Sequence, residues 1–205
     1  MARRNYWVIE GMADYGPVRL SKQLLATDTQ DAHAEHSRKA RTIYRAPSMP
    51  FAHALFSSLY LQRNSNPQAE EIRKFLREGM MDGISTLTRL IYAPKGETTD
   101  KVIHDYKQTT EKILTGNFVG KNGKIGVIEK GVLLAVLGDD NKKRIAEIYS
   151  WINLTPVYFS RINSRAIIPI KTVARFDVNS YRAYLNCYWN PEYSNSSLGV
   201  RAVRR

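Results

Sequence analysis

The sequence predicts an α+β fold, and its 205 residues suffice for one hydrophobic core. Two adjacent stretches, 51–63 and 68–80, carry apolar residues at helical spacing. Segments rich in aromatic and β-branched residues, with a period of two, gather mostly toward the C-terminus. Because no linker long enough to separate two domains interrupts this pattern, we expect a single domain over residues 1–205.

The N-terminal half is expected to contain one strand followed by two helices. Residues 5–10 (NYWVIE) are aromatic and β-branched, as in a strand. Ser48 is a candidate N-cap for the helix at 51–63. The helix at 68–80 has apolar residues along one face, and Gly83 follows its end.

Beyond these helices the apolar period changes toward two, with one further helix. That helix is expected over 141–151, because the sequence Asp-Asp-Asn at 139–141 is suited to a helix N-terminus. Residues 109–138 are ambiguous between strand, turn and helix. We expect the last strand to pair with the first. Strands are expected at 85–93, 101–107, 158–162, 172–176, 182–189 and 198–203.

The tail, 179–197, consists largely of Asn, Ser and Tyr, and its middle part alternates these residues with apolar ones. In a strand, alternate side chains face opposite sides of the sheet, so Leu185, Cys187 and Trp189 are expected in the core. Tyrosine offers a large, stiff contact area and asparagine offers donors and acceptors, which together predict a recognition surface. The side chains expected on this surface are those of Tyr184, Asn186, Tyr188 and Asn190.

Further candidates for ligand binding flank this strand or resemble it in composition. Any one of them is equally compatible with an ordinary polar strand surface, and it is their clustering that favours recognition. The flanking candidates are Asn179, Tyr181, Tyr193 and Asn195, and the upstream segment YFSRIN adds Tyr158, Ser160 and Asn163.

Composition limits the class of protein. The formal net charge of +12 favours nucleic acid, anionic surfaces or acidic partners. No apolar run approaches the length of a membrane span, and no apolar signal stretch follows the first residues, so we expect no membrane insertion and no cleaved export signal. The single cysteine suits a reducing compartment. We therefore expect a cytoplasmic protein, or one displayed through a partner.

The sequence contains no constellation typical of an enzyme or a cofactor site. His33 and His36 have helical spacing, but no third or fourth metal ligand accompanies them. Cys187 has no positioned base in sequence and is expected to face the core. We therefore expect no catalytic residue, no metal and no cofactor.

A cluster of basic residues supports a second hypothesis. Positive side chains with an aromatic neighbour can contact phosphates and bases. The alternative hypothesis is therefore a basic nucleic-acid-associated protein. The same residues are also compatible with an ordinary solvated face. The cluster consists of Arg38, Lys39, Arg41 and Arg45, with Tyr44 between them.

The ending SNSSLGVRAVRR resembles the end of C-type lectin-like domains, whose final strand carries a Leu/Ile-Gly-Phe/Val-Arg motif and pairs with the first strand. Gly199 and Arg201 match this motif, and Val200 replaces the commoner Phe. The Asn, Ser and Tyr enrichment resembles the variable region of proteins diversified by diversity-generating retroelements, in which adenines of a template repeat are miscopied. Among these, the chain resembles the variable proteins of Nanoarchaeota and related archaea.

The resemblance implies a C-type lectin-like fold, with two helices, mostly antiparallel short strands and a diversified binding face. It covers mainly residues 149–205, the expected variable region, and leaves 94–140 as an expected insertion. The calcium and sugar motifs and the disulfides of secreted lectins are absent, so sugar binding through calcium is not implied. The expected partner is a protein or surface ligand that differs between variants.

Overall fold

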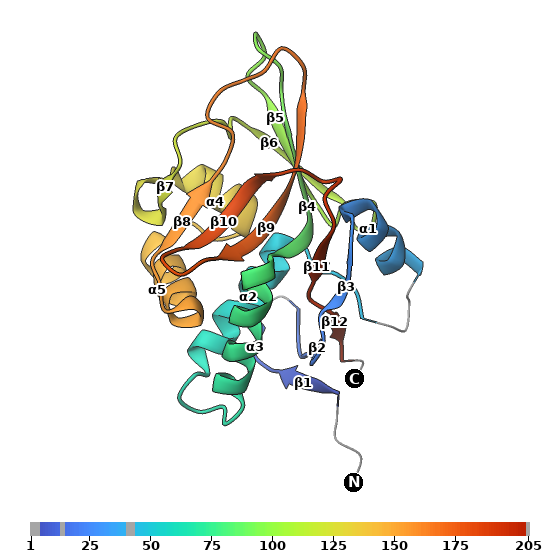
Figure 1. Ribbon diagram of the computed structural model, residues 1–205, viewed down its shortest axis with the longest axis vertical. Coiled ribbons are helices and arrows are strands. Elements are labelled where there is room, and N and C mark those ends of the chain that lie inside the picture. Colours follow the sequence, from blue (N-terminus) through green and yellow to red (C-terminus); the bar gives the residue numbers. More distant parts are fainter. Residues whose placement is uncertain (1–4, 13–14, 40–43, 204–205) are drawn as a thin grey trace.

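The computed structural model describes residues 5–12, 15–39 and 44–203 (Figure 1). Over these residues the chain is a mixture of helices and of strands in antiparallel and mixed sheets, which confirms the combination of α and β structure. The two helices that the lectin-like resemblance implies are too few, because the described residues form five α-helices and one short 3-10 helix.

The helices begin and end close to the expected boundaries where the sequence pattern is clear. The Asn141 side chain accepts a hydrogen bond from the Arg144 N–H at 3.1 Å and so caps its helix as predicted. Ser48 occupies the N-cap position of its helix but makes no capping bond. The helices are α1 Gln30–Lys39, α2 Met49–Leu61, α3 Ala69–Asp82, the 3-10 helix η1 Ile125–Val127, α4 Lys130–Leu137 and α5 Lys142–Asn153.

A large mixed sheet forms the centre of the molecule. Its strands follow the order β3-β11-β4-β9-β10-β8-β7, with β5 paired to β4 and β6 to β5. Most pairs are antiparallel, whereas β8 with β10 and β11 with β4 are parallel. The strands are β3 Leu25–Asp28, β4 Ile84–Tyr92, β5 Asp100–His104, β6 Lys112–Gly116, β7 Gly123–Lys124, β8 Val157–Ser160, β9 Ile170–Val178, β10 Ala183–Trp189 and β11 Asn195–Ser197.

A second, small sheet brings the two ends of the described chain together (Figure 1). It consists of β1 Tyr6–Ile9, β2 Val18–Ser21 and β12 Val200–Ala202, in the order β1-β2-β12. The expected pairing of the last strand with the first is therefore wrong in detail. Because the chain turns back after β1, β2 lies between the two strands, and Val200 pairs with Leu20 of β2.

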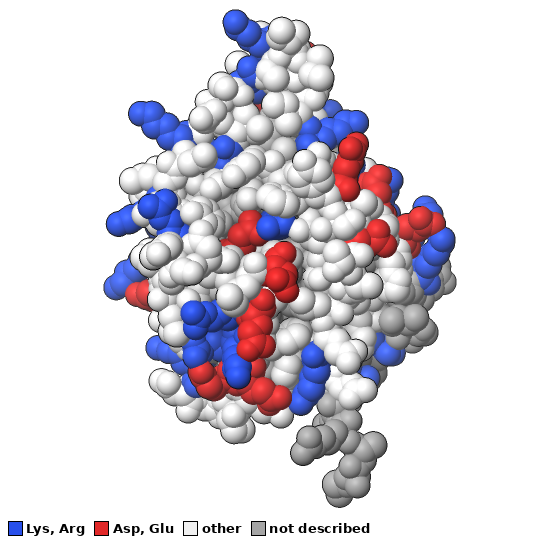
Figure 2. All heavy atoms as spheres, in the orientation of Figure 1, with Lys and Arg blue, Asp and Glu red and all other residues white. Residues whose placement is uncertain are grey.

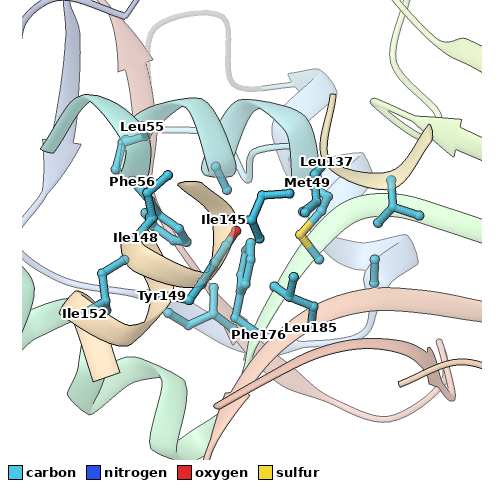
Figure 3. Close-up of a cluster of buried hydrophobic side chains, with 14 of the residues drawn as sticks. Met49, Leu55, Phe56, Leu137, Ile145, Ile148, Tyr149, Ile152, Phe176 and Leu185 are labelled. Carbon is cyan, nitrogen blue, oxygen red and sulfur yellow. The ribbon is translucent and has the colours of Figure 1, made fainter. Parts of the chain in front are cut away.

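The main core lies between the large sheet and helices α2 to α5. Phe56 of α2, Tyr149 of α5 and Phe176 of β9 form a cluster of aromatic contacts there (Figure 3). The opposite face of the sheet, which we call the outer face, is covered over β4 by α1. There the Gln30 side chain donates to the backbone carbonyls of Thr86 and Thr88 at 3.0 and 3.1 Å.

Residues 94–140 contribute to this same core. The side chains of Val102 and Phe118 are buried in it, as are Leu133 and Val136 of α4. The apolar run whose structure the sequence left ambiguous is thus helix α4, which ends at Gly138 in a left-handed conformation. Among the helices of the described residues, none combines the length and the apolar character needed to span a bilayer.

Candidate functional site

The candidate site is the outer face of β8, β10 and β9, the part of the sheet that carries the predicted tyrosines. Tyr158 of β8 is aligned with Tyr184 of β10, and their ring centroids are 6.3 Å apart. The guanidinium of Arg182 lies 4.5 Å from the centroid of the Tyr158 ring. Because Leu185 on the same strand is fully buried in the core, alternation places these half-buried tyrosines on the outer face.

A buried polar frame lies beside these tyrosines. Arg175 of β9 donates to the side chains of Asp177 and Asn195, and its guanidinium lies 3.6 Å from the centroid of the Trp189 ring. The Asn186 amide donates to the Asp177 carboxylate at 3.0 Å. These contacts fix the backbone and side chains under the site, which favours a preformed surface.

A β-bulge interrupts the predicted alternation of the strand. The ladder between β10 and β9 pairs Asn186 with Arg175 and Trp189 with Val173, so three steps along β10 correspond to two along β9. The bulge moves Trp189 to the face that carries Arg175, and the prediction of Trp189 as a core residue beside Cys187 is wrong. The other two residues predicted to lie in the core, Leu185 and Cys187, are buried as expected.

The expectation that all the alternate polar residues face solvent is also wrong. Asn186 is 5% exposed, Asn195 is 6% exposed and Ser160 is 8% exposed. Their burial follows from their position next to the Arg175 and Asp177 frame, and from coverage by neighbouring segments. Of the predicted set, those with the most accessible aromatic rings are Tyr181, Tyr188 and Tyr193, at 81%, 48% and 59% exposure.

The predicted asparagines act locally. The side-chain oxygens of Asn179, Asn186 and Asn190 each accept a hydrogen bond from the backbone N–H two residues later, at 3.0, 3.1 and 3.0 Å. The Asn195 side chain donates to the carbonyl of Tyr193 at 3.0 Å. Asparagine favours such turns because its side chain mimics a backbone group. The asparagines of the tail therefore stabilise turns and the bulge, and the prediction of a recognition surface now rests on the tyrosines.

The tail residues form two separate groups. Asn179 and Tyr181 lie in the turn between β9 and β10, at the opposite end of β10 from Asn190 and Tyr193. Tyr193 packs against Trp189 with ring centroids 5.7 Å apart. The structure thus brings the Trp189 end of the tail into the site and leaves Asn179 and Tyr181 beyond the other end of the strand.

Tyr188 and Asn163 share a pocket of about 420 Å³ at the carboxyl ends of the parallel strands β8 and β10. Ile162 and Ile170 give it an apolar wall. Arg161, also in the lining, is buried and donates to the Glu129 carboxylate at 2.6 Å. Because the Arg161 guanidinium is already paired with Glu129, the pocket offers a ligand aromatic and apolar contacts more than a positive charge for an anion.

The predicted basic cluster carries mixed charge. Arg38, Lys39 and Arg45 are exposed, and Arg41 lies outside the described residues. Lys39 is paired with Glu35 on the same helix, and acidic and basic side chains lie side by side over α1 in Figure 2. This mixture of signs weakens the electrostatic attraction of the surface for phosphates.

Sequence reasoning missed a cleft of about 580 Å³ that is lined by α2, by the β5–β6 hairpin and by the end of α4, with Arg144 of α5. In its wall, His53 of α2 contacts the Asp139 carboxylate at 3.0 Å and the Tyr149 hydroxyl at 3.1 Å. Arg144 forms two hydrogen bonds with Asp139, and these partners hold the pKa of that carboxyl far below its usual range. The signal in the sequence was Asp139 itself, which was interpreted as part of a helix cap.

The histidines of this cleft are engaged on both ring nitrogens. His104 contacts the Thr88 hydroxyl at 2.9 Å and the Ala135 carbonyl at 2.8 Å, and desolvation lowers its pKa to about 4. His53 is bonded on both sides as well, so the two rings connect α2 to α5, and β5 to β4 and α4, along the wall of the cleft.

Cys187 and His33 are both buried. Burial raises the pKa of the Cys187 thiol, so it stays protonated and unreactive at neutral pH. His33 is buried, and its Nε2 contacts the backbone carbonyl of Asn195 at 2.7 Å. No group of three or more potential ligands suited to a metal ion occurs within the part of the chain that the structure describes. The sequence matches no protein-family model, no curated protein and no solved structure.

Proposed function

We propose that this chain is a ligand-binding protein. Its contact layer is formed by tyrosines on the outer face of β8 and β10 and by tyrosines near Trp189, where β10 ends. The observation that carries the proposal is the placement of Tyr158 and Tyr184 beside a buried, hydrogen-bonded frame, with Tyr188 exposed at the adjoining end of β10. Tyrosine loses little conformational entropy when it binds, and a fixed frame lowers the cost of ordering the site. Such a surface recognises a protein or another surface ligand through shape, aromatic contact and hydrogen bonds.

We further propose that the scaffold is C-type lectin-like and that its binding face is diversified by a retroelement. The order of elements supports this part of the proposal. Helices α2 and α3 follow the N-terminal strands, β4, β9 and β10 form three adjacent antiparallel strands, and β12 returns to pair with β2. This arrangement agrees with the helix pair and the returning last strand that the resemblance implies.

The buried frame predicts which codons of the tail can vary and which cannot. A larger side chain at Asn186 or Asn195 would displace buried partners, whereas any side chain fits at exposed Tyr181, Tyr188 or Tyr193. In the source genome, we expect a near-copy of the coding sequence for the tail beside a reverse transcriptase gene. The two copies should differ at adenine positions in codons for the exposed residues, and agree at Asn186 and Asn195.

Two genomic outcomes would contradict this. If no such repeat exists, retroelement diversification fails, although the tyrosine surface could still bind a fixed ligand. If the repeat differs at the codons of Asn186 and Asn195 as freely as at exposed positions, the buried frame does not constrain variation as proposed.

A display library tests binding directly. Randomising Tyr158, Tyr184, Tyr188 and Tyr193 in the full chain should yield binders to an arbitrary panel of folded proteins, because the frame beneath stays intact. A matched library at the exposed α3 positions Glu71, Lys74 and Glu78 should yield few or none, since a charged helix surface lacks aromatic anchors. Equal yields from the two libraries would contradict the proposal.

A nucleic-acid-associated role through Arg38, Lys39, Arg41 and Arg45 is the alternative. It predicts binding to DNA of unrelated sequence with a steep dependence on salt, and loss of that binding in Arg38→Ala with Arg45→Ala. The ligand-binding proposal predicts instead that these two substitutions leave binders selected from the tyrosine library unaffected.

A further inference from the structure

The upper end of the molecule carries two adjacent isoleucines exposed to solvent. Ile167 is 88% exposed and Ile168 is 71% exposed, in the loop 161–169 that connects β8 and β9 at the top of Figure 1. Leaving large aliphatic side chains in water is unfavourable, and adjacent ones in a loop commonly mark a contact site. The two isoleucines do not line the Tyr188 pocket, although residues 161–166 of the same loop do, so that pocket does not account for their exposure.

The loop is held in place by a buried ion pair. Asp100 is fully buried and accepts hydrogen bonds from the backbone N–H groups of Ala93 and Phe118, at 2.9 and 2.7 Å. Arg165 forms an ion pair with Asp100 and also donates to the Ala93 carbonyl at 3.0 Å. The neighbouring loop 93–99 is joined by a bond of 2.7 Å from the Lys95 N–H to the Ala166 carbonyl.

These contacts fix the backbone before the isoleucine pair, and the pairing of Ile170 with Tyr92 at the start of β9 fixes it after the pair. The apolar side chains are therefore presented by an ordered support rather than by a free loop, so contact with a partner costs little ordering entropy.

Exposed lysines lie on the segments next to the loop that carries the isoleucines. Lys95 lies in the adjacent loop, and Lys101 and Lys171 align with Ile91 of β4 from the two neighbouring strands. Among the described residues, none of these lysines forms an ion pair, and Glu97 is the exposed acidic residue of the 93–99 loop. Figure 2 shows basic side chains on the uppermost part of the molecule, whereas the acidic side chains gather lower.

We propose that this end of the molecule, which we call the isoleucine tip, docks peripherally on an anionic lipid surface. The isoleucines would enter the interfacial region while Lys95, Lys101 and Lys171 contact anionic headgroups. Apolar burial and electrostatic attraction act together in such binding. Nucleic acid is a poorer fit, because unpaired bases stack on aromatic side chains and the isoleucine pair offers none.

Vesicle co-sedimentation of the full chain tests the proposal. The wild-type protein should bind phosphatidylcholine vesicles that contain phosphatidylserine, and bind them much less at high salt or without phosphatidylserine. Ile167→Ser with Ile168→Ser should weaken binding by about tenfold or more. Lys95→Glu with Lys171→Glu should abolish the preference for phosphatidylserine.

Matched controls separate the tip from general surface effects. Leu61→Ser and Val127→Ser replace apolar side chains of similar exposure, 71% and 72%, elsewhere on the molecule. Lys74→Glu with Lys143→Glu changes the net charge by the same amount on exposed helix surfaces. These variants should sediment with vesicles as the wild type does, or, for the charge control, with only a small loss.

Two outcomes would overturn the proposal: no vesicle binding by the wild-type chain, or equal losses of binding in the tip and control variants. If vesicle binding is absent and the tip substitutions abolish capture of a protein ligand, the isoleucines belong to a protein interface. Thermal unfolding of each variant identifies any loss caused by misfolding. Because the tyrosine library is assayed without lipid, failure here is distinguishable from failure of the tyrosine surface.

Discussion

The side-chain oxygen of Asn186 accepts a hydrogen bond from the backbone N–H of Tyr188 at 3.1 Å, within a single strand. This bond lies in the β-bulge of β10, where the ladder with β9 shifts register. In the same bulge Tyr188 is 48% exposed, and Trp189 lies over the guanidinium of Arg175. The register shift thus changes which aromatic residues of β10 reach the surface.

Substitution of the bulge asparagine should destabilise the fold. Asn186→Ala removes a buried side chain's bonds to Tyr188 and Asp177 and leaves partly buried partners unsatisfied, so we expect a loss of about 1–3 kcal/mol in the free energy of unfolding. Asn190→Ala at an exposed turn should cost at most about 0.5 kcal/mol. Chemical denaturation of both variants gives the comparison, and equal effects would contradict the assigned role of the bulge.

Arg175 should be the most sensitive position of the frame. Arg175→Met removes the partner of Asp177 and Asn195 in a largely buried setting, which we expect to cost about 3 kcal/mol. The control is Arg182→Met, because Arg182 is exposed and its guanidinium lies over the Tyr158 ring, and its loss should cost about 1 kcal/mol or less. A smaller effect at Arg175 than at Arg182 in urea unfolding would refute the frame.

Stability should fall as the pH drops from about 6.5 to 4. The folded pKa of His104 is about 4, below the ordinary value of 6.5, so the unfolded chain binds more protons in this window. The shift corresponds to roughly 3 kcal/mol lost between the two pKa values. His104→Gln should flatten this dependence, and His36→Gln, on the exposed side of α1, should preserve it. An unchanged slope in His104→Gln would show that other groups control the acid response.

The lone cysteine should resist modification in the folded state. Cys187 is fully buried, and desolvation raises the pKa of its thiol, so the reactive thiolate is scarce and inaccessible. A thiol reagent such as dithionitrobenzoate should therefore label the native protein far more slowly than the protein in guanidinium chloride. Labelling at comparable rates in the two states would place Cys187 at the surface and contradict the strand register.

The sequence predicted most of the elements because their signals are local. Helical spacing identified α2 and α3, and the asparagine at 141 identified the start of α5. The apolar run of α4 remained ambiguous, since a short continuous run fits a buried helix and a buried strand equally. The partner of the last strand was predicted wrongly because pairing between remote segments leaves no periodic trace.

The candidate site was predicted in part. Residue types alone identified the tyrosines of the tail and the buried neighbours Leu185 and Cys187. The burial of Asn186 and Asn195 was missed, because it depends on Arg175 and on a bulge whose register needs the facing strand. Alternation is a reliable guide to facing only while the ladder remains regular.

The amino-acid sequence by itself determined that helices and strands would form, among them the tyrosine-rich strand β10. Residue propensity and apolar period act over only a few residues, so they can be recognised without the tertiary structure. Tertiary structure decided which of those tyrosines reach solvent, how His53 meets Asp139, and that Ile167 and Ile168 project from one end. These features arise where segments far apart in sequence meet, and hydrogen bonds between such segments cannot be read from either one alone.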